Sequence, residues 1–196
     1  AQRLRQKPLL GEDADLRQLE FEAIRINQSL MQLLVMYKVD QNAFGLMVDV
    51  HPATDVLEEI MAQQRGLLAL KSLQCSLECV DDLMCYCDFQ YLSHVLASVL
   101  NNALRYSHKT LLMTAYEEAG YVVFAIEDDG DGYPDGLLKT DWQQPLSVDW
   151  AGGHTGLGLF FAAMIAGLHK NGSRHGTIRL DNQSRLGGAR FRLFLP

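Results

Sequence analysis

The chain has 196 residues, of which 48% are hydrophobic, and it carries a formal net charge of −7 at pH 7. Its mean hydropathy is −0.04, and this size and composition fit an ordinary globular protein with one sizeable core and an appendage. The acidic balance argues against a general nucleic-acid binder, and no apolar run reaches the ~18 residues of a membrane span.

The start of the sequence shows neither a Met nor a signal peptide. We therefore expect the chain to be part of a longer protein, in which a membrane anchor or a sensor domain could lie upstream. Any association with a membrane is expected to depend on that upstream region.

A long helix is predicted over residues 13–39, because apolar side chains recur there at three- and four-residue steps. The main stripe consists of Leu16, Leu19, Ala23, Ile26, Leu30, Leu33 and Tyr37, and it is widened by Ile24, Met31, Leu34 and Met36. We expect this broad surface to pack against another helix, such as one from a second subunit. The alternative is a helix that simply covers the main domain. A turn follows at 41–45, and the domains are predicted to span residues 1–45 and 46–196.

The second domain is predicted to be an α+β sandwich, with one mixed sheet and helices layered on one face. Helices are expected after Pro52, over 89–106 and over 155–170, while residues 135–153 show no period. Ala119 and Gly120 are expected to form a hairpin turn. Strands are predicted by alternating apolar residues at 46–51, 73–80, 84–89, 110–118, 121–128, 176–182 and 189–196.

The four cysteines are predicted to be reduced thiols in or beside two strands. Their spacing contains no C-x-x-C pair, which disfavours a zinc site. They are Cys75, Cys79, Cys85 and Cys87.

The first of three candidate motifs is SVLNNALRYS, residues 98–107. Ser98, Asn102 and Arg105 share one helix face, opposite a buried apolar stripe. An amide oxygen can ligate Mg²⁺, and a guanidinium can neutralise phosphate charge. The alternative is an ordinary solvated helix face.

The second motif is EDDGDGYP, residues 127–134, at the end of a predicted strand. A carboxylate at a buried strand end, such as Asp128, can accept a hydrogen bond from an exocyclic amine. Gly130 and Gly132 would let a flat base approach the backbone. An acidic hairpin turn is the alternative, while a calcium loop is excluded because the D-x-D-x-D-G pattern is absent.

The third motif is GGHTGLGL, residues 152–159, which opens a predicted helix. Backbone N–H groups at a helix N-terminus favour anions, and glycines let phosphate oxygens approach closely. The segment does not match the G-x-x-x-x-G-K-[ST] pattern of a P-loop. No strand directly precedes it, as a Rossmann turn would require.

Together, these segments resemble the ATP-binding domain of sensor histidine kinases, in the GHKL superfamily that also contains DNA gyrase and MutL. The three motifs look like the N box and the two glycine boxes, and the final hairpin is similar too. The resemblance covers about residues 46–196, and residues 13–39 are similar to the second helix of the dimerisation and phosphotransfer hairpin. It implies a Bergerat fold with Mg-ATP bound between helices and sheet, and residues 135–153 as a mobile lid.

The resemblance also implies roles for individual residues. Asn102 matches the magnesium ligand, Arg105 the basic phosphate contact and Tyr106 a residue that lines the nucleotide. Asp128 matches the carboxylate that reads the adenine amine, with the turn glycines Gly130 and Gly132 beneath it. The phosphate loop would comprise Thr155, Gly156, Leu157 and Gly158.

Three features depart from the family pattern. No histidine precedes the helix at 13–39, so no phosphoacceptor is visible in the chain. Truncation is the expected explanation, and a natural pseudokinase is the alternative. Ser98 stands where the family often has Asn or an acidic residue, so no catalytic base is assigned. The lid shows no clear Phe-x-x-Phe segment and has Trp142 and Trp150 instead, and we expect His154 there to be a solvated residue.

The sequence therefore predicts the cytoplasmic ATP-binding domain of a two-component histidine kinase. ATP and Mg²⁺ are the expected ligands, a response-regulator receiver domain is the expected partner, and the full-length protein is expected to be a homodimer. The main alternative is a non-enzymatic adaptor with a degenerate nucleotide site. A serine kinase of the anti-sigma type is disfavoured by the long leading helix.

Overall fold

The structure is a computed structural model that describes residues 26, 29–41, 43–142 and 157–196. The chain divides into two compact units, Ala1–Phe44 and Gly45–Pro196. In the first unit, residues 29–40 are helical, and the earlier part of the predicted helix lies outside the described residues apart from Ile26. Within the described part of the chain, no helix is long and apolar enough to cross a bilayer. Among the described residues of this unit, the large apolar side chains that are exposed include Ile26, Leu30, Met31, Leu33, Leu34 and Tyr37.

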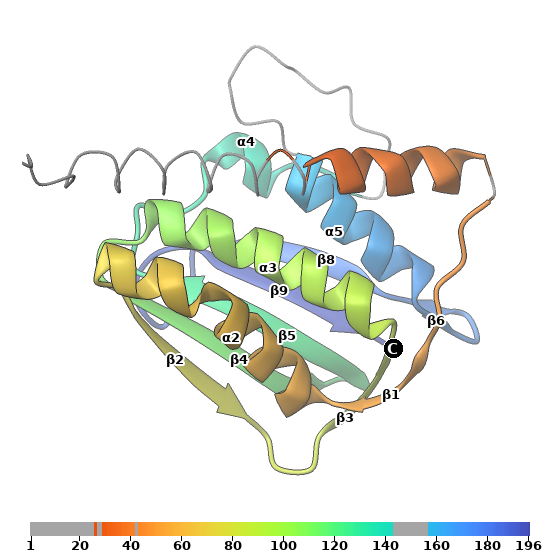
Figure 1. Ribbon diagram of the computed structural model, residues 1–196, viewed down its shortest axis with the longest axis horizontal. Helices are drawn as coiled ribbons and strands as arrows, with labels where there is room; N and C mark the ends of the chain where they lie inside the picture. The colour runs from red at the N-terminus through yellow and green to blue at the C-terminus, as the bar shows by residue number, and fades with distance from the viewer. Residues whose placement is uncertain (1–25, 27–28, 42, 143–156) are drawn as a thin grey trace, which may run out of the picture. The chain divides into compact units, whose positions relative to one another are not determined.

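The second unit contains a five-stranded mixed sheet with helices on one face (Figure 1), which confirms the predicted fold class. Its strands, in spatial order, are β2 (Gln74–Cys79), β4 (Thr110–Glu118), β5 (Tyr121–Asp128), β9 (Arg190–Leu195) and β8 (Thr177–Asp181). The first pair is parallel and the other neighbours are antiparallel. The covering helices are α2 (Ala53–Lys71), α3 (Phe89–Tyr106) and α5 (Leu157–Leu168).

Helix α3 forms where the sequence predicts it, because a cap and an apolar stripe agree. Asp88 is the N-cap, and its side chain accepts a hydrogen bond from the backbone N–H of Tyr91 at 3.2 Å. The stripe buries one face against the sheet and the neighbouring helices, and leaves the opposite face to solvent. Its buried apolar members are Leu92, Val95, Leu96, Ala97, Val99, Leu100, Ala103 and Leu104.

The hairpin of β4 and β5 turns at Ala119 and Gly120, as predicted. Both residues have positive φ, 52° and 76°, which is the requirement of a type I′ turn between twisted strands. The paired register runs from Glu118 opposite Tyr121 to Leu111 opposite Asp128. The turn thus fixes Asp128 at the far end of the hairpin, next to the end of α3.

The prediction of a single sheet is wrong, because four short strands pair outside it. β1 (Asp49–Pro52) pairs with β3 (Met84–Cys87), and β6 (Lys170–Asn171) pairs with β7 (Arg174–His175). Alternation identifies a strand but carries no information about its partner.

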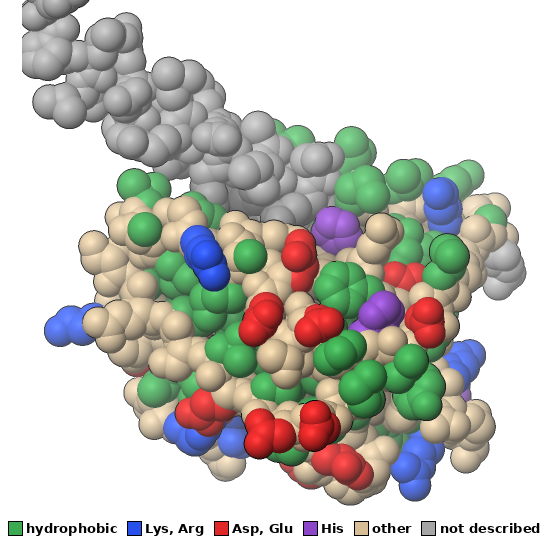
Figure 2. Space-filling model, turned by 60° about the horizontal axis from the view of Figure 1, so that its bottom comes forward, with side chains coloured by type: hydrophobic (Ala, Val, Ile, Leu, Met, Phe, Trp, Pro, Cys, Tyr) green, Lys and Arg blue, Asp and Glu red, His purple; other side chains and the backbone are tan. Residues whose placement is uncertain are grey.

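One face of the β1–β3 ribbon is open to solvent. It exposes Val50, Met84 and Tyr86, whereas Cys85 and Cys87 are fully buried. Figure 2 shows hydrophobic and acidic side chains side by side on the face brought forward from the bottom of Figure 1. All four cysteines are free thiols, on β2 and β3 as expected.

The stretch predicted to be irregular begins with a short helix, α4 (Asp135–Leu138). Pro134 precedes it with φ −64°, a value set by its ring, and Thr140 Oγ1 donates a hydrogen bond to the Gly136 carbonyl at 2.8 Å. Four residues are too few to produce a recognisable helical period, so this helix could not be predicted from the sequence. Residues 143–153 of the predicted lid, including Trp150, lie outside the described residues.

Candidate functional site

The polar face of α3 carries the first group of predicted residues. Asn102 and Arg105 are exposed and Ser98 is half-buried, on the side away from the buried stripe. The guanidinium carbon of Arg105 lies 5.7 Å from the ring centroid of Tyr106, a distance at which cation and ring attract each other. Tyr106 is 47% exposed. An amide, a cation and an aromatic ring are therefore presented together at the end of this helix.

The start of α5 lies against this face. A Cβ atom built on Gly158 would stand 3.1 Å from Ser98 Oγ and 3.8 Å from Asn102 Nδ2. Leu157 is 7% exposed and anchors the first turn of α5 in the core. The structure thus brings Gly158 of the third motif next to Ser98 and Asn102 of the first motif, which lie far from it in the sequence. Thr155, Gly156 and His154 lie outside the described residues.

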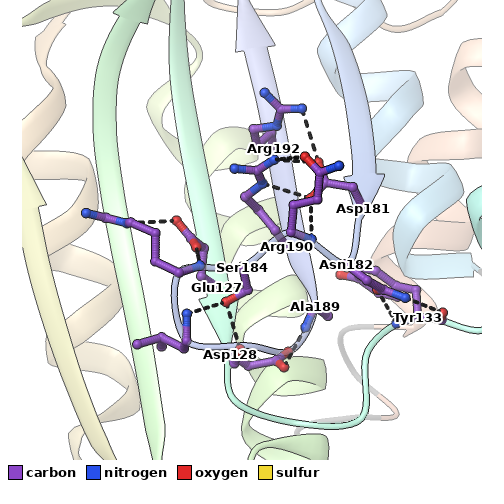
Figure 3. A network of polar contacts seen from close by, with 12 residues as sticks. Glu127, Asp128, Tyr133, Asp181, Asn182, Ser184, Ala189, Arg190 and Arg192 are labelled. Atoms are coloured by element: carbon purple, nitrogen blue, oxygen red, sulfur yellow. Dashed lines mark hydrogen bonds and ion pairs between the residues drawn. The ribbon is translucent and has the colours of Figure 1, made fainter.

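Asp128 ends β5 with a buried carboxylate, 6% exposed (Figure 3). Its Oδ1 accepts hydrogen bonds from the backbone N–H of Gly130, at 2.9 Å, and of Ala189, at 3.0 Å. Both bonds end on the same oxygen, so Oδ2 is not engaged by them. A buried carboxylate with one committed oxygen can accept a further donor, such as an exocyclic amine.

The backbone around Asp128 is held by the connection between β8 and β9. The Gly188 N–H and Ser184 Oγ both donate to the Asp128 carbonyl, at 3.0 and 2.8 Å. A Cβ on Gly188 would collide with the Asp128 carboxylate and the Gly130 nitrogen, so only glycine permits this approach. Ser184 and Gly188 hold Asp128 in place, and neither was predicted from the sequence. The pair Gly187-Gly188 before the last strand is the one sequence feature that indicates a close approach of the backbone here.

The glycines of the second motif contact two other segments. A Cβ on Gly130 would stand 2.5 Å from the Tyr106 carbonyl oxygen, so this turn touches the end of α3. Gly132 has φ +86° and faces the side chain of Asn182. Asn182 in turn accepts from the Tyr133 N–H at 2.7 Å and donates to its carbonyl at 3.0 Å (Figure 3). The turn is therefore held on both sides, and Asn182 is another residue that sequence reasoning missed.

Asp129, next to the site residue Asp128, has a different role. Its carboxylate accepts from the backbone N–H groups of His108, Lys109 and Thr110 at 2.8–3.1 Å, and from the Thr110 hydroxyl. Burial acts to raise the pKa of Asp129, but these hydrogen bonds outweigh it and lower the pKa. Asp129 thus fixes the connection between α3 and β4, while Asp128 faces the interior.

The three motifs therefore meet at one end of the helical layer. A helix face with an amide and a cation, a glycine at a helix start, and a buried carboxylate beside a glycine turn form a single site. Among the described residues, no three His, Cys, Asp or Glu side chains gather as a metal cluster would require. The fold and this site are those expected of a nucleotide-binding α+β domain.

Comparison with known proteins identifies the family. Residues 87–196 match the family of histidine kinase-, DNA gyrase B- and HSP90-like ATPases. The matched range contains the described residues of all three motifs and most of the sheet. The chain belongs to this family.

Relatives agree with this assignment, and solved structures share the fold. A probable sensor histidine kinase, HK, of Mycobacterium tuberculosis is 27% identical over 197 residues, covering 98% of this chain and 49% of that protein. The chain thus spans about half the length of this relative. The structure of the Acinetobacter baumannii histidine kinase AdeS superposes with a TM-score of 0.68 and 23% identity, covering 97% of this chain and 85% of that one. The structure of full-length ShkA in complex with AMPPNP superposes with a TM-score of 0.70 and 16% identity, covering 97% of this chain and 40% of that one.

Proposed function

We propose that the chain is the ATP-binding kinase domain of a two-component sensor histidine kinase. In the full-length protein, the γ-phosphoryl group of ATP would pass to a histidine and then to an aspartate of a response-regulator receiver domain. The relatives named as sensor histidine kinases support this proposal. We also propose that the full-length protein is a homodimer and that this domain works in the cytoplasm, where ATP is available.

The observation that carries the proposal is the approach of Gly158 to Ser98 and Asn102. Gly158, in the first turn of α5, approaches the amide of α3, and backbone N–H groups at the start of a helix can bind phosphate. Asp128 would read the adenine amine, with Gly130 and Gly132 beneath the base. Arg105 would contact phosphate and Tyr106 would line the nucleotide. Thr155, Gly156 and Leu157 would complete the phosphate loop.

The donor set also fits Mg²⁺. This ion usually keeps several waters and takes one or two protein ligands together with substrate phosphates, so the exposed amide of Asn102 is sufficient. When bound, Mg²⁺ would neutralise phosphate charge. The protein itself would orient the nucleotide and exclude water from it.

The residue at position 98 favours transfer over hydrolysis. The Ser98 hydroxyl cannot act as a general base at neutral pH, so this position does not activate water. A histidine side chain needs no such base, because its neutral imidazole nitrogen is itself the nucleophile. The nitrogen–phosphorus bond would form as the bond to the leaving ADP oxygen breaks.

The test uses the full-length protein that contains this chain, incubated with γ-³²P-labelled ATP. We expect an acid-labile, alkali-stable label, because the phosphorus–nitrogen bond of phosphohistidine is cleaved by acid. Asp128→Asn should abolish labelling, while Asp131→Asn, in the same turn but with a side chain 98% exposed, should retain it. An acid-stable label would instead indicate a serine kinase. Nucleotide binding without any label, or neither binding nor label, would contradict the kinase proposal and favour the adaptor.

A further inference from the structure

A buried contact links the ends of α3 and α5 that lie away from the candidate site. At the site, Gly158 near the start of α5 meets the α3 side chains Ser98 and Asn102. At the other ends, His169, directly after α5, meets Asp88, the N-cap of α3. His169 and Asp88 are 2% and 6% exposed. The position of α5 along α3 is therefore fixed from both ends.

The imidazole of His169 makes two hydrogen bonds that define which ring nitrogen carries the proton. Its Nε2 accepts the backbone N–H of Asp88 at 3.0 Å, so the ring proton is on Nδ1, which donates to the Ile165 carbonyl at 2.8 Å. Burial lowers the pKa of His169, although the bond to Ile165 and the charge of Asp88 act in the opposite direction. The ring is thus neutral, and its two nitrogens join the last turn of α5 to the start of α3.

The carboxylate of Asp88 extends this link to a third segment. Its Oδ1 accepts the Tyr91 N–H, and its Oδ2 accepts the N–H of Met47 at 2.8 Å. Met47 lies on the connection between the start of the second unit, at Gly45, and β1. Its side chain is 85% exposed, so the hydrogen bond to Asp88, and not burial of its own side chain, holds Met47 here.

We propose that Asp88 and His169 are positioning residues that transmit a displacement of the connection at Met47 to α5, and so set the affinity of the nucleotide site. This inference rests on the proposed nucleotide binding. Moving Met47 away would leave a buried carboxylate oxygen without its donor, which is costly, so Asp88 would follow it. Because His169 is bonded to Asp88 and packed interiors do not deform freely, α5 would shift against α3. Gly158, at the opposite end of the same helix, would then move relative to Asn102.

Asp88→Asn isolates the contact with Met47. An Asn oxygen can still cap α3, but its NH₂ group cannot accept the Met47 N–H. His169→Leu removes both imidazole bonds, whereas His169→Gln keeps one donor and one acceptor. His175→Ala is the matched control, since this exposed histidine also lies near a carbonyl of α5, that of Gly167 at 3.3 Å.

Two readouts test the proposal. The first is calorimetric titration with Mg²⁺ and a non-hydrolysable ATP analogue. We expect the Kd to rise roughly 5-fold or more for Asp88→Asn and His169→Leu, by less for His169→Gln, and not at all for His175→Ala. The second is amide hydrogen exchange at residues 157–160, which should be faster in Asp88→Asn although the substitution lies at the other end of the helices.

The outcomes separate this proposal from the proposed function. If the unchanged chain binds no nucleotide, the proposed function fails, and faster exchange at 157–160 still supports the link. If Asp88→Asn lowers the melting temperature but leaves both the Kd and the exchange at 157–160 unchanged, its role is only structural and the inference is overturned. Should His169→Leu fail to fold, Asp88→Asn provides the same test.

Discussion

At the scale of residues, the adjacent aspartates Asp128 and Asp129 of the second motif have different roles. Asp128 follows Phe124 and Ile126 on the inward face of β5, because side chains two apart in a strand point to the same side. Asp129 points the other way and holds the α3–β4 connection through three backbone donors and one hydroxyl. Asp128 therefore faces the proposed adenine site, and Asp129 stabilises the α3–β4 connection beside it.

Asp129→Asn should lower the free energy of unfolding by about 1–2 kcal/mol at pH 7, since one amide oxygen cannot replace a carboxylate that accepts several bonds. The lowered pKa of Asp129 gives this contribution a pH dependence. It is fully present above the unfolded pKa of about 3.9, and it is lost as the pH falls through the lower folded pKa.

Urea denaturation at pH 7 and at pH 3 checks this. The difference in the free energy of unfolding between the unchanged protein and Asp129→Asn should be smaller at pH 3 than at pH 7. Asp131→Asn serves as the control, because the Asp131 side chain is exposed and lies 3.5 Å from the His108 ring. Equal stability of Asp129→Asn and the unchanged protein at pH 7 would contradict the role assigned to Asp129.

At the scale of elements, the close approach of α5 to α3 forms the site. Gly158→Ala should separate stability from function. Alanine favours a helix over glycine by up to about 1 kcal/mol, so the melting temperature should not fall much. The new methyl group would meet Ser98 Oγ at 3.1 Å and narrow the space for phosphate, so binding of an ATP analogue should weaken several-fold.

Gly167→Ala is the matched control for this experiment. Gly167 lies in the same helix, and a Cβ there would meet nothing within 4 Å. It should gain helix stability without affecting nucleotide binding. Fluorescence competition with a labelled nucleotide would measure both variants. Equal affinity of Gly158→Ala and Gly167→Ala would contradict the placement of phosphate at the start of α5.

Elements with strong local patterns could be predicted from the sequence, and those that depend on distant partners could not. The bounds of α3 and of the β4–β5 hairpin follow from an apolar stripe, a cap and a two-residue turn. The separate pairing of β1 with β3 does not, because alternation is the same whichever partner a strand has. Asn182 and Gly188 likewise contact the turn after β5 through tertiary contacts that no local pattern encodes.

At the scale of the whole molecule, the proposed nucleotide site belongs to a protein whose net charge is negative. The net charge is −7, and acidic side chains are prominent on the face seen in Figure 2. We therefore expect binding of a polyanion to depend on local features, namely Arg105, the start of α5 and the metal that accompanies ATP. This predicts that Mg²⁺ strongly increases the affinity for the nucleotide.

The most direct test of the central claim is calorimetric titration of this chain with a non-hydrolysable ATP analogue, with and without Mg²⁺. We predict binding that is stronger with Mg²⁺, is abolished by Asp128→Asn and loses its Mg²⁺ dependence in Asn102→Ala. Absence of binding under both conditions, or unchanged binding by both variants, would contradict the assignment of the nucleotide site.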